Sequence, residues 1–289
     1  FYAVAAESLI FDGQLKTIEQ SDIDRFPYLS YLDEFLSNYM SIFELKCCLS
    51  SLEEYNVDYY LIDGSIYGDL QNPFPKGVET SAKAKKDLIS ATLNDFEEMV
   101  KNPSDKGVYS PKLFNKYFKI YQEHKYPYTL YLTTIERLVV LKEILKNPRK
   151  MIAISKSSSN NDIFHSNMPD IAIFDKYTQK EGISKVIRKK VSKDINTTFP
   201  VFDEFFKDLK FTIFYLRLAD YKNVLKVELP YEASMAEIEE IAAKLKKFST
   251  NGYPYLLKKA HNDVVISDKN IKELINIAKV REKSGREML

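Results

Sequence analysis

Apolar and polar positions follow two different periods in the first sixty residues. Loose alternation on either side of Asp12-Gly13, over residues 1–11 and 14–19, predicts a β-hairpin with its turn at that dipeptide. From Tyr28 to Glu54 apolar residues recur at three- and four-residue steps, which predicts an amphipathic helix. The apolar run from Val57 to Ile62 then predicts a short strand.

Helical periodicity dominates the next part of the chain. Three helices are predicted, separated by segments that contain Pro or Gly. They cover about residues 82–101, 111–123 and 131–145. We interpret them as a helical insertion over approximately residues 80–147. A second buried strand is predicted at Met151–Ser155, and it runs into a polar loop over residues 156–161.

Strands and helices alternate again in the C-terminal part. The predicted strands are Phe211–Leu216, Val224–Leu229 and Val264–Ile266. The predicted helices are Ser234–Phe248, a short one from Pro254 to near His261, and Lys269–Ala278. Asn251-Gly252 is interpreted as the C-cap of the first of these helices. Strands interleaved with helices favour an α/β or α+β sheet with helical cover, and we expect residues 1–289 to form a single domain.

The bulk composition is ordinary for a soluble globular protein. Hydrophobic residues make up 45% of the 289 residues and charged residues 29%. Neither a membrane-spanning apolar run nor a signal peptide is visible, so we expect an intracellular protein without membrane association. The adjacent Cys47 and Cys48 match neither a disulfide framework nor a zinc motif. Few glycines and no Trp would suit a thermophilic source.

The net charge of +1 gives no general attraction to nucleic acid, so any such surface must be a local concentration of Lys and Arg. Lys-rich segments occur at Lys83–Lys86, Lys185–Lys193 and Lys258-Lys259. Solvated helix faces are the simpler interpretation of each segment alone. The chain has no P-loop, Rossmann glycine pattern or G-x-S-x-G motif, which argues against nucleotide hydrolysis by a P-loop.

Two carboxylates are candidates for a metal site. Asp63 follows an apolar strand and precedes Gly64, a place where open sheets often carry function, although Asp-Gly is also a common turn. Glu44 follows Met40 by four residues and precedes Cys47 by three, so it lies on or beside the buried stripe of its helix. The short helix-to-strand connection can bring Glu44 towards Asp63. Converging carboxylates suit Mn²⁺ or Mg²⁺, and a surface-edge glutamate remains the alternative.

The segment after Gly252 carries a second pair of candidates. His261 could act as a general acid or base or contact a phosphate, and Tyr253 could hydrogen-bond a phosphate or stack on a base. A helix-end histidine and a core tyrosine are the structural alternatives. Lys156 opens a polar loop and could reach a phosphate, as could Lys258 and Lys259, but solvated lysines fit equally well.

Other polar residues are given no chemical role. Glu136 follows Thr133 by three residues, which is the spacing of a helix-capping box. His124 and His165 have no supporting partners in the sequence.

With these features in this order, the chain resembles the NurA family of archaeal and bacterial nucleases. The resemblance lies in four places and is most specific in the last of them. These are the helix bearing Glu44 with the strand into Asp63-Gly64-Ser65, then 169–184, then 211–215 with 224–230, and 252–261. Residues 65–150 match only by their helical character.

The resemblance implies a ribonuclease H-like fold with a central mixed sheet flanked by helices. It also implies Mn²⁺-dependent cleavage of DNA, as a 5′→3′ exonuclease and single-strand endonuclease, with Mg²⁺ as a possible substitute. A homodimer and a partnership with a HerA-type hexameric translocase in resecting broken DNA ends are implied as well. By matching position, Glu44 and Asp63 correspond to metal ligands, and Tyr253 and His261 to a C-terminal active-site pair.

The family's first metal-binding Asp lies on a strand that precedes the segment matching Phe1 to Ser8. We therefore expect that strand and its Asp upstream of Phe1, and the register gives no support for Glu7 as a substitute. Two other functions stay open. One is a weakly active or inactive relative that binds DNA or acts as an adaptor, and the other is a ribonuclease H-like enzyme that cleaves RNA.

Overall fold

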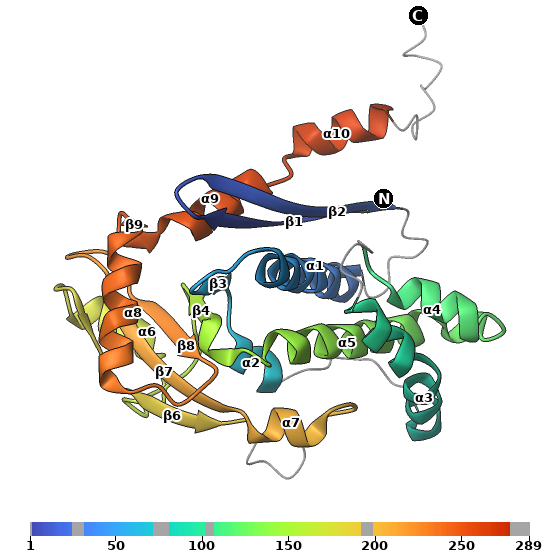
Figure 1. The fold of residues 1–289 in the computed structure, drawn as a ribbon, viewed down its shortest axis with the longest axis horizontal. Coiled ribbons are helices and arrows are strands. Elements are labelled where there is room, and N and C mark those ends of the chain that lie inside the picture. Colours follow the sequence, from blue (N-terminus) through green and yellow to red (C-terminus); the bar gives the residue numbers. More distant parts are fainter. Residues whose placement is uncertain (1, 25–31, 72–80, 102–106, 192–198, 278–289) are drawn as a thin grey trace, which may run out of the picture.

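A six-stranded mixed β-sheet forms the centre of the fold in this computed structural model, which describes residues 2–24, 32–71, 81–101, 107–191 and 199–277 (Figure 1). The strand order is β3-β4-β8-β7-β5, and β6 pairs with β7 beside β5. β3 and β4 are parallel, and the other pairs are antiparallel. The strands are β3 (Tyr60–Asp63), β4 (Met151–Ser155), β5 (Gly182–Ile183), β6 (Ile187–Lys190), β7 (Lys210–Arg217) and β8 (Leu225–Leu229).

The two faces of this sheet pack against different helices. All residues of β4 and β8 are buried, as their continuous apolar runs predict for strands that are covered on both sides. α8 (Met235–Lys247) covers one face with Ile238, Ile241 and Leu245. On the other face, β4 and β7 share a core with helices α1 (Leu32–Glu54), α2 (Ile66–Gln71) and α5 (Lys125–Ile144).

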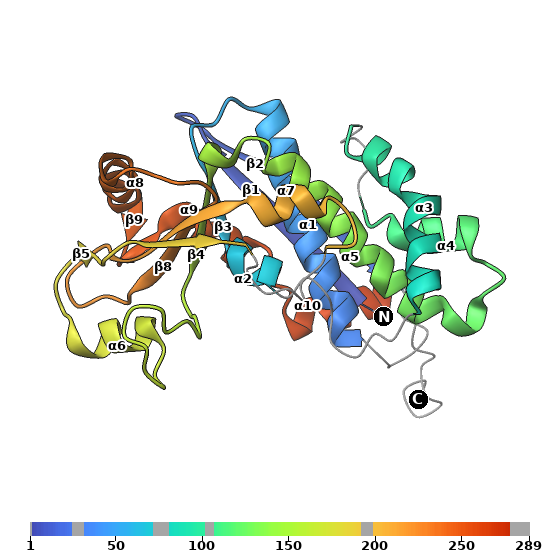
Figure 2. The ribbon, with the colours of Figure 1, turned by 90° about the horizontal axis from the view of Figure 1, so that it is seen from below.

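The helical region extends away from the sheet. α3 (Ala82–Met99) and α4 (Ser110–Tyr117) lie at the end of the molecule opposite α6 (Asp170–Tyr177) and α8 (Figures 1 and 2). The helix predicted at 111–123 ends at Tyr117, and a 3-10 turn, η1 (Gln122–His124), leads into α5. Two shorter helical pieces are η2 (Pro148–Lys150) before β4 and α7 (Asp203–Asp208) before β7.

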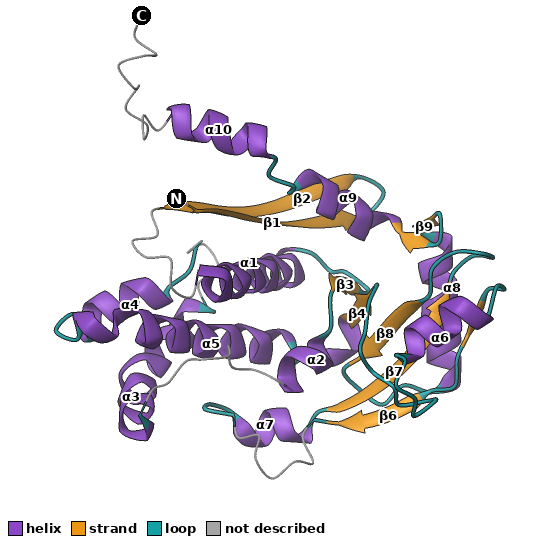
Figure 3. Ribbon diagram, turned by 180° about the vertical axis from the view of Figure 1, so that it is seen from behind, coloured by secondary structure: helices purple, strands orange, loops and turns teal. Residues whose placement is uncertain are grey.

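The N-terminal hairpin is separate from the central sheet. β1 (Tyr2–Phe11) and β2 (Leu15–Asp24) pair antiparallel, and Gly13 adopts a φ of +99° in the turn, as the Asp-Gly signal predicts. The hairpin lies over α1, with α9 (Tyr255–Asp263) beside it (Figure 3). Val4 and Ala6 of β1 pack against Phe43 of α1, so this apolar contact holds the hairpin in place.

Three predictions about the C-terminal and helical parts are wrong. Residues 264–266 form no strand, because Val264 caps α9 and the following residues connect it to α10 (Asp268–Ile277). Asn251-Gly252 is not a helix C-cap but the turn of a small hairpin, β9 (Ser249–Thr250) and β10 (Tyr253–Pro254). Thr133 and Glu136 form no capping box, because both lie in the middle of α5.

The remaining predicted elements correspond to observed ones, apart from boundary residues 1, 28–31 and 278, which lie outside the described residues. The fold class is the predicted one, an α/β fold with a central mixed sheet flanked by helices, and its strand order is compatible with a ribonuclease H-like architecture. In the part of the chain that the structure describes, every helix is too short or too polar to cross a bilayer.

Candidate active site

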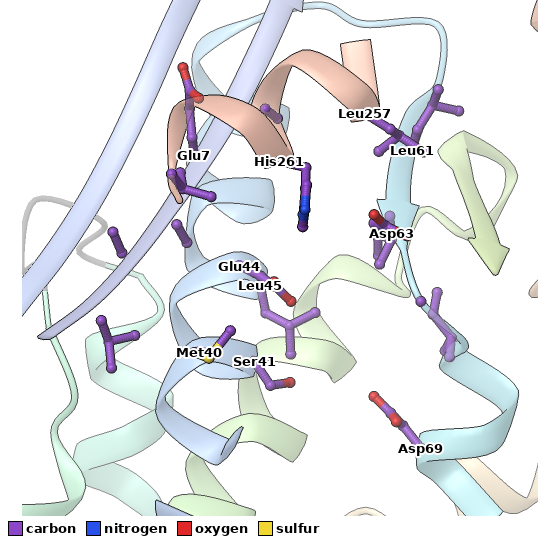
Figure 4. Close-up of a pocket in the computed structure, with 18 of the residues that line it drawn as sticks. Glu7, Met40, Ser41, Glu44, Leu45, Leu61, Asp63, Asp69, Leu257 and His261 are labelled. Carbon is purple, nitrogen blue, oxygen red and sulfur yellow. The ribbon is translucent and has the colours of Figure 1, made fainter. Parts of the chain in front are cut away.

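A cavity of about 420 Å³ opens beside the end of β3. Its walls come from β1, α1, the β3–α2 connection, α5 and α9. In Figure 4 four polar side chains, Glu44, Asp63, Asp69 and His261, point towards one another across it. Elements from both halves of the sequence therefore place three carboxylates and an imidazole around one space.

Asp63 is held at the end of its strand by contacts with the neighbouring strand β4. The Gly64 amide donates to the Ile154 carbonyl over 2.9 Å, and the Ser155 hydroxyl donates to the Gly64 carbonyl over 2.8 Å. Gly64 itself has a φ of +144°, a backbone conformation that other residues rarely adopt. The turn predicted from Asp-Gly is therefore real, and it directs the Asp63 carboxylate into the cavity.

Glu44 reaches the same cavity from α1. The residues around it on the helix, Phe43 and Leu45, are buried, whereas Glu44 lies beside that buried stripe with its side chain open to the cavity. Loss of solvation, followed by the nearby carboxylates of Asp63 and Asp69, raises the pKa of Glu44 to about 7. The charges of Asp63 and Asp69 thus add to the loss of solvation in disfavouring ionisation of Glu44.

His261 approaches from the opposite wall. It lies in the last turn of α9 and points down towards Glu44 and Asp63 (Figure 4). Glu7 of β1 also lines the cavity, but its carboxylate points away from the other acidic groups. The Glu7 carboxylate therefore lies apart from those of Glu44 and Asp63.

Tyr253 and Lys156 surround Asp63 on its other side. The Lys156 ammonium lies 3.2 Å from Asp63 Oδ2 and 4.4 Å from the centre of the Tyr253 ring. The Tyr253 hydroxyl is buried and has no hydrogen-bond partner within ordinary geometric limits. Burial, and then the neighbouring Asp63 carboxylate, raise the pKa of that hydroxyl. Tyr253 therefore lies against Asp63, outside the cavity that contains His261.

The other lysines proposed from sequence lie further from these groups. Lys259 pairs with Asp263 on the same helix, and this hydrogen bond raises the pKa of the lysine. Lys258 is exposed, and neither lysine lines the cavity. Of the three candidate lysines, only Lys156 contacts a carboxylate of the cavity.

Sequence reasoning missed two charged residues that line the cavity. Asp69 lies on α2 and Arg137 on α5. Burial raises the pKa of Asp69, and Arg137 opposes this shift. For Arg137, the signal available in the sequence was the charged step Glu136-Arg137 within the largely buried centre of α5.

Two buried lysine–glutamate pairs were also missed. Glu136 is fully buried, pairs with Lys46 over 2.8 Å and accepts hydrogen bonds from the first residues of α4. Lys226 and Glu228 of β8 pair over 2.7 Å and are almost completely buried. Charged residues inside a buried strand were the signal for the second pair.

The residues around the cavity have the donor chemistry of a hard divalent cation. Within the described ranges no three His, Cys, Asp or Glu side chains come close enough to form a complete metal site. Mg²⁺-like ions, however, often bind through only one or two carboxylates and keep several waters for substrate phosphate to replace. Glu44 and Asp63 are two carboxylates on one such cavity, and a cation between them would offset both the loss of solvation and the like-charge repulsion that raise the pKa of Glu44.

Comparison with known proteins gives one consistent result. The family model described as the NurA domain matches residues 1–266. The chain is 29% identical over 315 aligned positions to the probable DNA double-strand break repair nuclease NurA of Methanocaldococcus jannaschii, covering 100% of this chain and 76% of that protein.

Two solved structures are similar to the fold described above. The crystal structure of the NurA nuclease from Sulfolobus solfataricus has a TM-score of 0.71 and 26% identity, covering 96% of this chain and 77% of that one. A crystal structure of NurA bound to dAMP and manganese has a TM-score of 0.66 and covers 99% of this chain and 89% of that one. Its sequence identity is 15%, so it demonstrates a shared fold only.

Proposed function

This chain belongs to the NurA domain family, and on that premise we propose that it is a metal-dependent deoxyribonuclease acting in the repair of DNA double-strand breaks. One observation carries the proposal beyond family membership. Glu44 and Asp63, from a helix and a strand, line one cavity, where loss of solvation and then the carboxylates of Asp63 and Asp69 raise the pKa of Glu44 to about 7. Carboxylates placed close together at the surface of a cavity are costly without a cation, and phosphodiester cleavage is a reaction that uses one.

We propose that Glu44 and Asp63 hold the metal ion, with Mn²⁺ as the preferred ion and Mg²⁺ as a possible substitute. The related protein solved with dAMP and manganese supports this choice of ion. A divalent ion at this site would polarise the scissile phosphate and favour ionisation of a bound water. The protein's own part is to direct both carboxylates into the cavity.

The remaining residues suit roles around a DNA phosphate. His261 faces the carboxylates from the opposite wall, where its imidazole can donate a proton to the departing oxygen. Lys156 can exchange its contact with Asp63 for one with a phosphate, since both side chains are partly exposed. The Tyr253 hydroxyl lies against Asp63 without a hydrogen bond of good geometry and can hydrogen-bond the substrate. Lys258 and Lys259 are proposed as more distant DNA contacts.

A third carboxylate is expected from the family on a strand that precedes residues 1–8. Residues of β1 and of β3 both line the cavity. Among the described strands, β1 pairs only with β2 and β3 only with β4, so each has one edge that pairs with no described strand.

The finer aspects of the activity rest on family membership alone. These are the 5′→3′ exonuclease and single-strand endonuclease modes, the homodimer and the HerA-type translocase partner. We also propose a single nuclease domain over residues 1–289 with a helical insertion at about 80–147, which corresponds to α3, α4 and α5.

Digestion of labelled single-stranded DNA, with and without Mn²⁺, tests the proposal. We expect Mn²⁺-dependent cleavage that falls at least about 100-fold in Asp63→Asn, because one ligand is lost. Asp220→Asn is the matched control: Asp220 also pairs with a lysine, Lys180, but does not line the cavity. Undiminished cleavage by Asp63→Asn would refute the assignment. DNA binding without cleavage would support the adaptor alternative, and equal or faster cleavage of RNA the ribonuclease alternative.

A further inference from the structure

The Lys226–Glu228 pair lies directly behind the Asp63-Gly64-Ser65 turn. Both residues are on β8, two positions apart, so their side chains leave the same face of the sheet. The register pairs Glu228 with Ala153 of β4 and Ile213 of β7, which places it at the middle of the sheet. The Glu228 side chain is 0% exposed and that of Lys226 2%. A charged pair removed from water to this extent is costly unless each member has good partners.

Glu228 finds its remaining partners on the turn that carries Asp63. The Ser65 hydroxyl donates to Glu228 Oε1 over 2.5 Å, and the Tyr67 amide donates to Oε2 over 2.9 Å. The Ser65 oxygen in turn accepts from the Gly68 amide over 2.9 Å. Glu228 and Ser65 thus satisfy the first amides of α2, whose preceding residues lead back to Asp63.

Lys226 contacts the second segment beside Asp63. Its ammonium lies 2.7 Å from Glu228 Oε1 and 3.4 Å from the side-chain oxygen of Asn160. Asn160 belongs to the loop that begins at Lys156, and Lys156 lies 3.2 Å from Asp63. One buried pair therefore contacts both chain segments that meet at the Asp63 carboxylate.

From these contacts we infer that Glu228, charge-paired with Lys226, is a positioning residue: it fixes the Asp63-Gly64-Ser65 turn from the sheet side so that Asp63 faces the cavity. The inference rests on the proposed nuclease function. Glu228 itself points to the turn, not into the cavity, and does not line it. Its effect on the reaction is therefore indirect, through the orientation of Asp63.

The test separates the hydrogen bonds from the charges. In the full chain, Lys226→Met with Glu228→Met removes both, whereas Lys226→Met with Glu228→Gln keeps an amide that can bond Ser65 and Tyr67. We expect the first variant to lower kcat about 10- to 100-fold and raise the Mn²⁺ concentration for half-maximal rate about 10-fold. The KM for single-stranded DNA should change little. The variant with Glu228→Gln should have a kcat and a Mn²⁺ requirement close to those of the wild type.

The second buried pair supplies a matched control. Lys46→Met with Glu136→Met removes a pair of similar burial that braces α1, α4 and α5 without contacting the turn. Thermal unfolding compares the stabilities of the two double variants. We expect the control to keep the wild-type kcat and Mn²⁺ requirement even if its stability falls. If kcat falls and the Mn²⁺ concentration for half-maximal rate rises to the same extent in both double variants, Glu228 acts on overall stability alone. That result overturns the inference.

Two outcomes distinguish this inference from the proposed function. If the wild-type protein cleaves DNA and Asp63→Asn abolishes cleavage, but the Met–Met variant at 226 and 228 retains wild-type kcat and Mn²⁺ requirement, only the positioning role is wrong. If the wild-type protein itself shows no Mn²⁺-dependent cleavage, the proposed function fails first.

Should the Met–Met variant not fold, Ser65→Ala breaks the same link, and Ser65→Thr should restore it. Wild-type kinetics in Ser65→Ala would overturn the inference.

Discussion

Lys156 contacts Asp63 although 93 residues separate them, with the ammonium 3.2 Å from Oδ2. Their side chains are 49% and 37% exposed, so the pair contributes at most about 1 kcal/mol to stability. The ammonium also lies over the Tyr253 ring. The same lysine therefore connects a proposed metal ligand with an aromatic residue, at a place where a DNA phosphate is expected.

Lys156→Met should weaken DNA binding while leaving the fold intact. Because a phosphate contact is lost, we expect KM for single-stranded DNA to rise severalfold and the slope of log KM against log salt to decrease by about 1. Titrations of rate against DNA at several salt concentrations measure both. Lys180→Met, which breaks the remote pair with Asp220, is the control and should change neither. A salt slope unchanged in Lys156→Met would exclude the phosphate role.

Ionisation of Glu44 should lower the stability of the metal-free protein as pH rises. The pKa of Glu44 is raised from 4.5 to about 7 on folding, so below 4.5 both states are protonated. Between pH 4.5 and 7 Glu44 is ionised in the unfolded chain but still protonated in the folded protein. The free energy of unfolding therefore decreases as pH rises through this range. Glu44→Gln removes this contribution. Denaturant titrations in chelator at pH 4.5, 6 and 8 should therefore show a smaller stability loss in the variant, and parallel curves would contradict the prediction.

Gly68→Ala should separate stability from activity. A Cβ at Gly68 would lie 2.8 Å from Ser65 Oγ, so the serine hydroxyl must turn away from Glu228. Replacing glycine with alanine inside a helix also stabilises the helix by up to about 1 kcal/mol. We expect the gain in helix propensity to offset part of the lost Ser65–Glu228 contact, so that kcat falls while the unfolding temperature changes little. Asn94→Ala, on an exposed position of α3, favours helix without touching the turn and should keep kcat. Undiminished kcat in Gly68→Ala would show that the Ser65 contact is dispensable.

Tyr253→Phe should cost activity but not stability. The Tyr253 hydroxyl is buried against the Asp63 carboxylate without a hydrogen bond of good geometry, so its removal loses little favourable interaction energy. We expect the unfolding temperature to stay level or rise, and kcat on DNA to fall at least about 10-fold if the hydroxyl serves the reaction, as general acid–base and hydrogen-bonding groups do. A fall of several degrees in unfolding temperature would indicate a hydrogen bond that supports the fold.

Periodicity in the sequence predicted the elements that carry the cavity, but not the contacts behind it. The apolar steps of α1 and the short connection to β3 were enough to bring Glu44 and Asp63 to one place. The link between Ser65 and Glu228 spans 163 residues, and no local pattern encodes such a contact. The strand predicted at 264–266 was wrong for a local reason. Three consecutive apolar residues after α9 have the same pattern as a short strand, and the sequence there does not distinguish the two.

The cavity combines residues 44 and 63 with residue 261, and this separation governs when the site can exist during synthesis. α1 and β3 can leave the ribosome and begin to pack long before α9 has been made. Roughly 200 further residues must be added before His261 arrives, which takes about 10–40 s at ordinary translation rates. A nascent chain therefore carries both proposed metal ligands without the imidazole. The same holds for Glu228, which is added roughly 165 residues after Asp63.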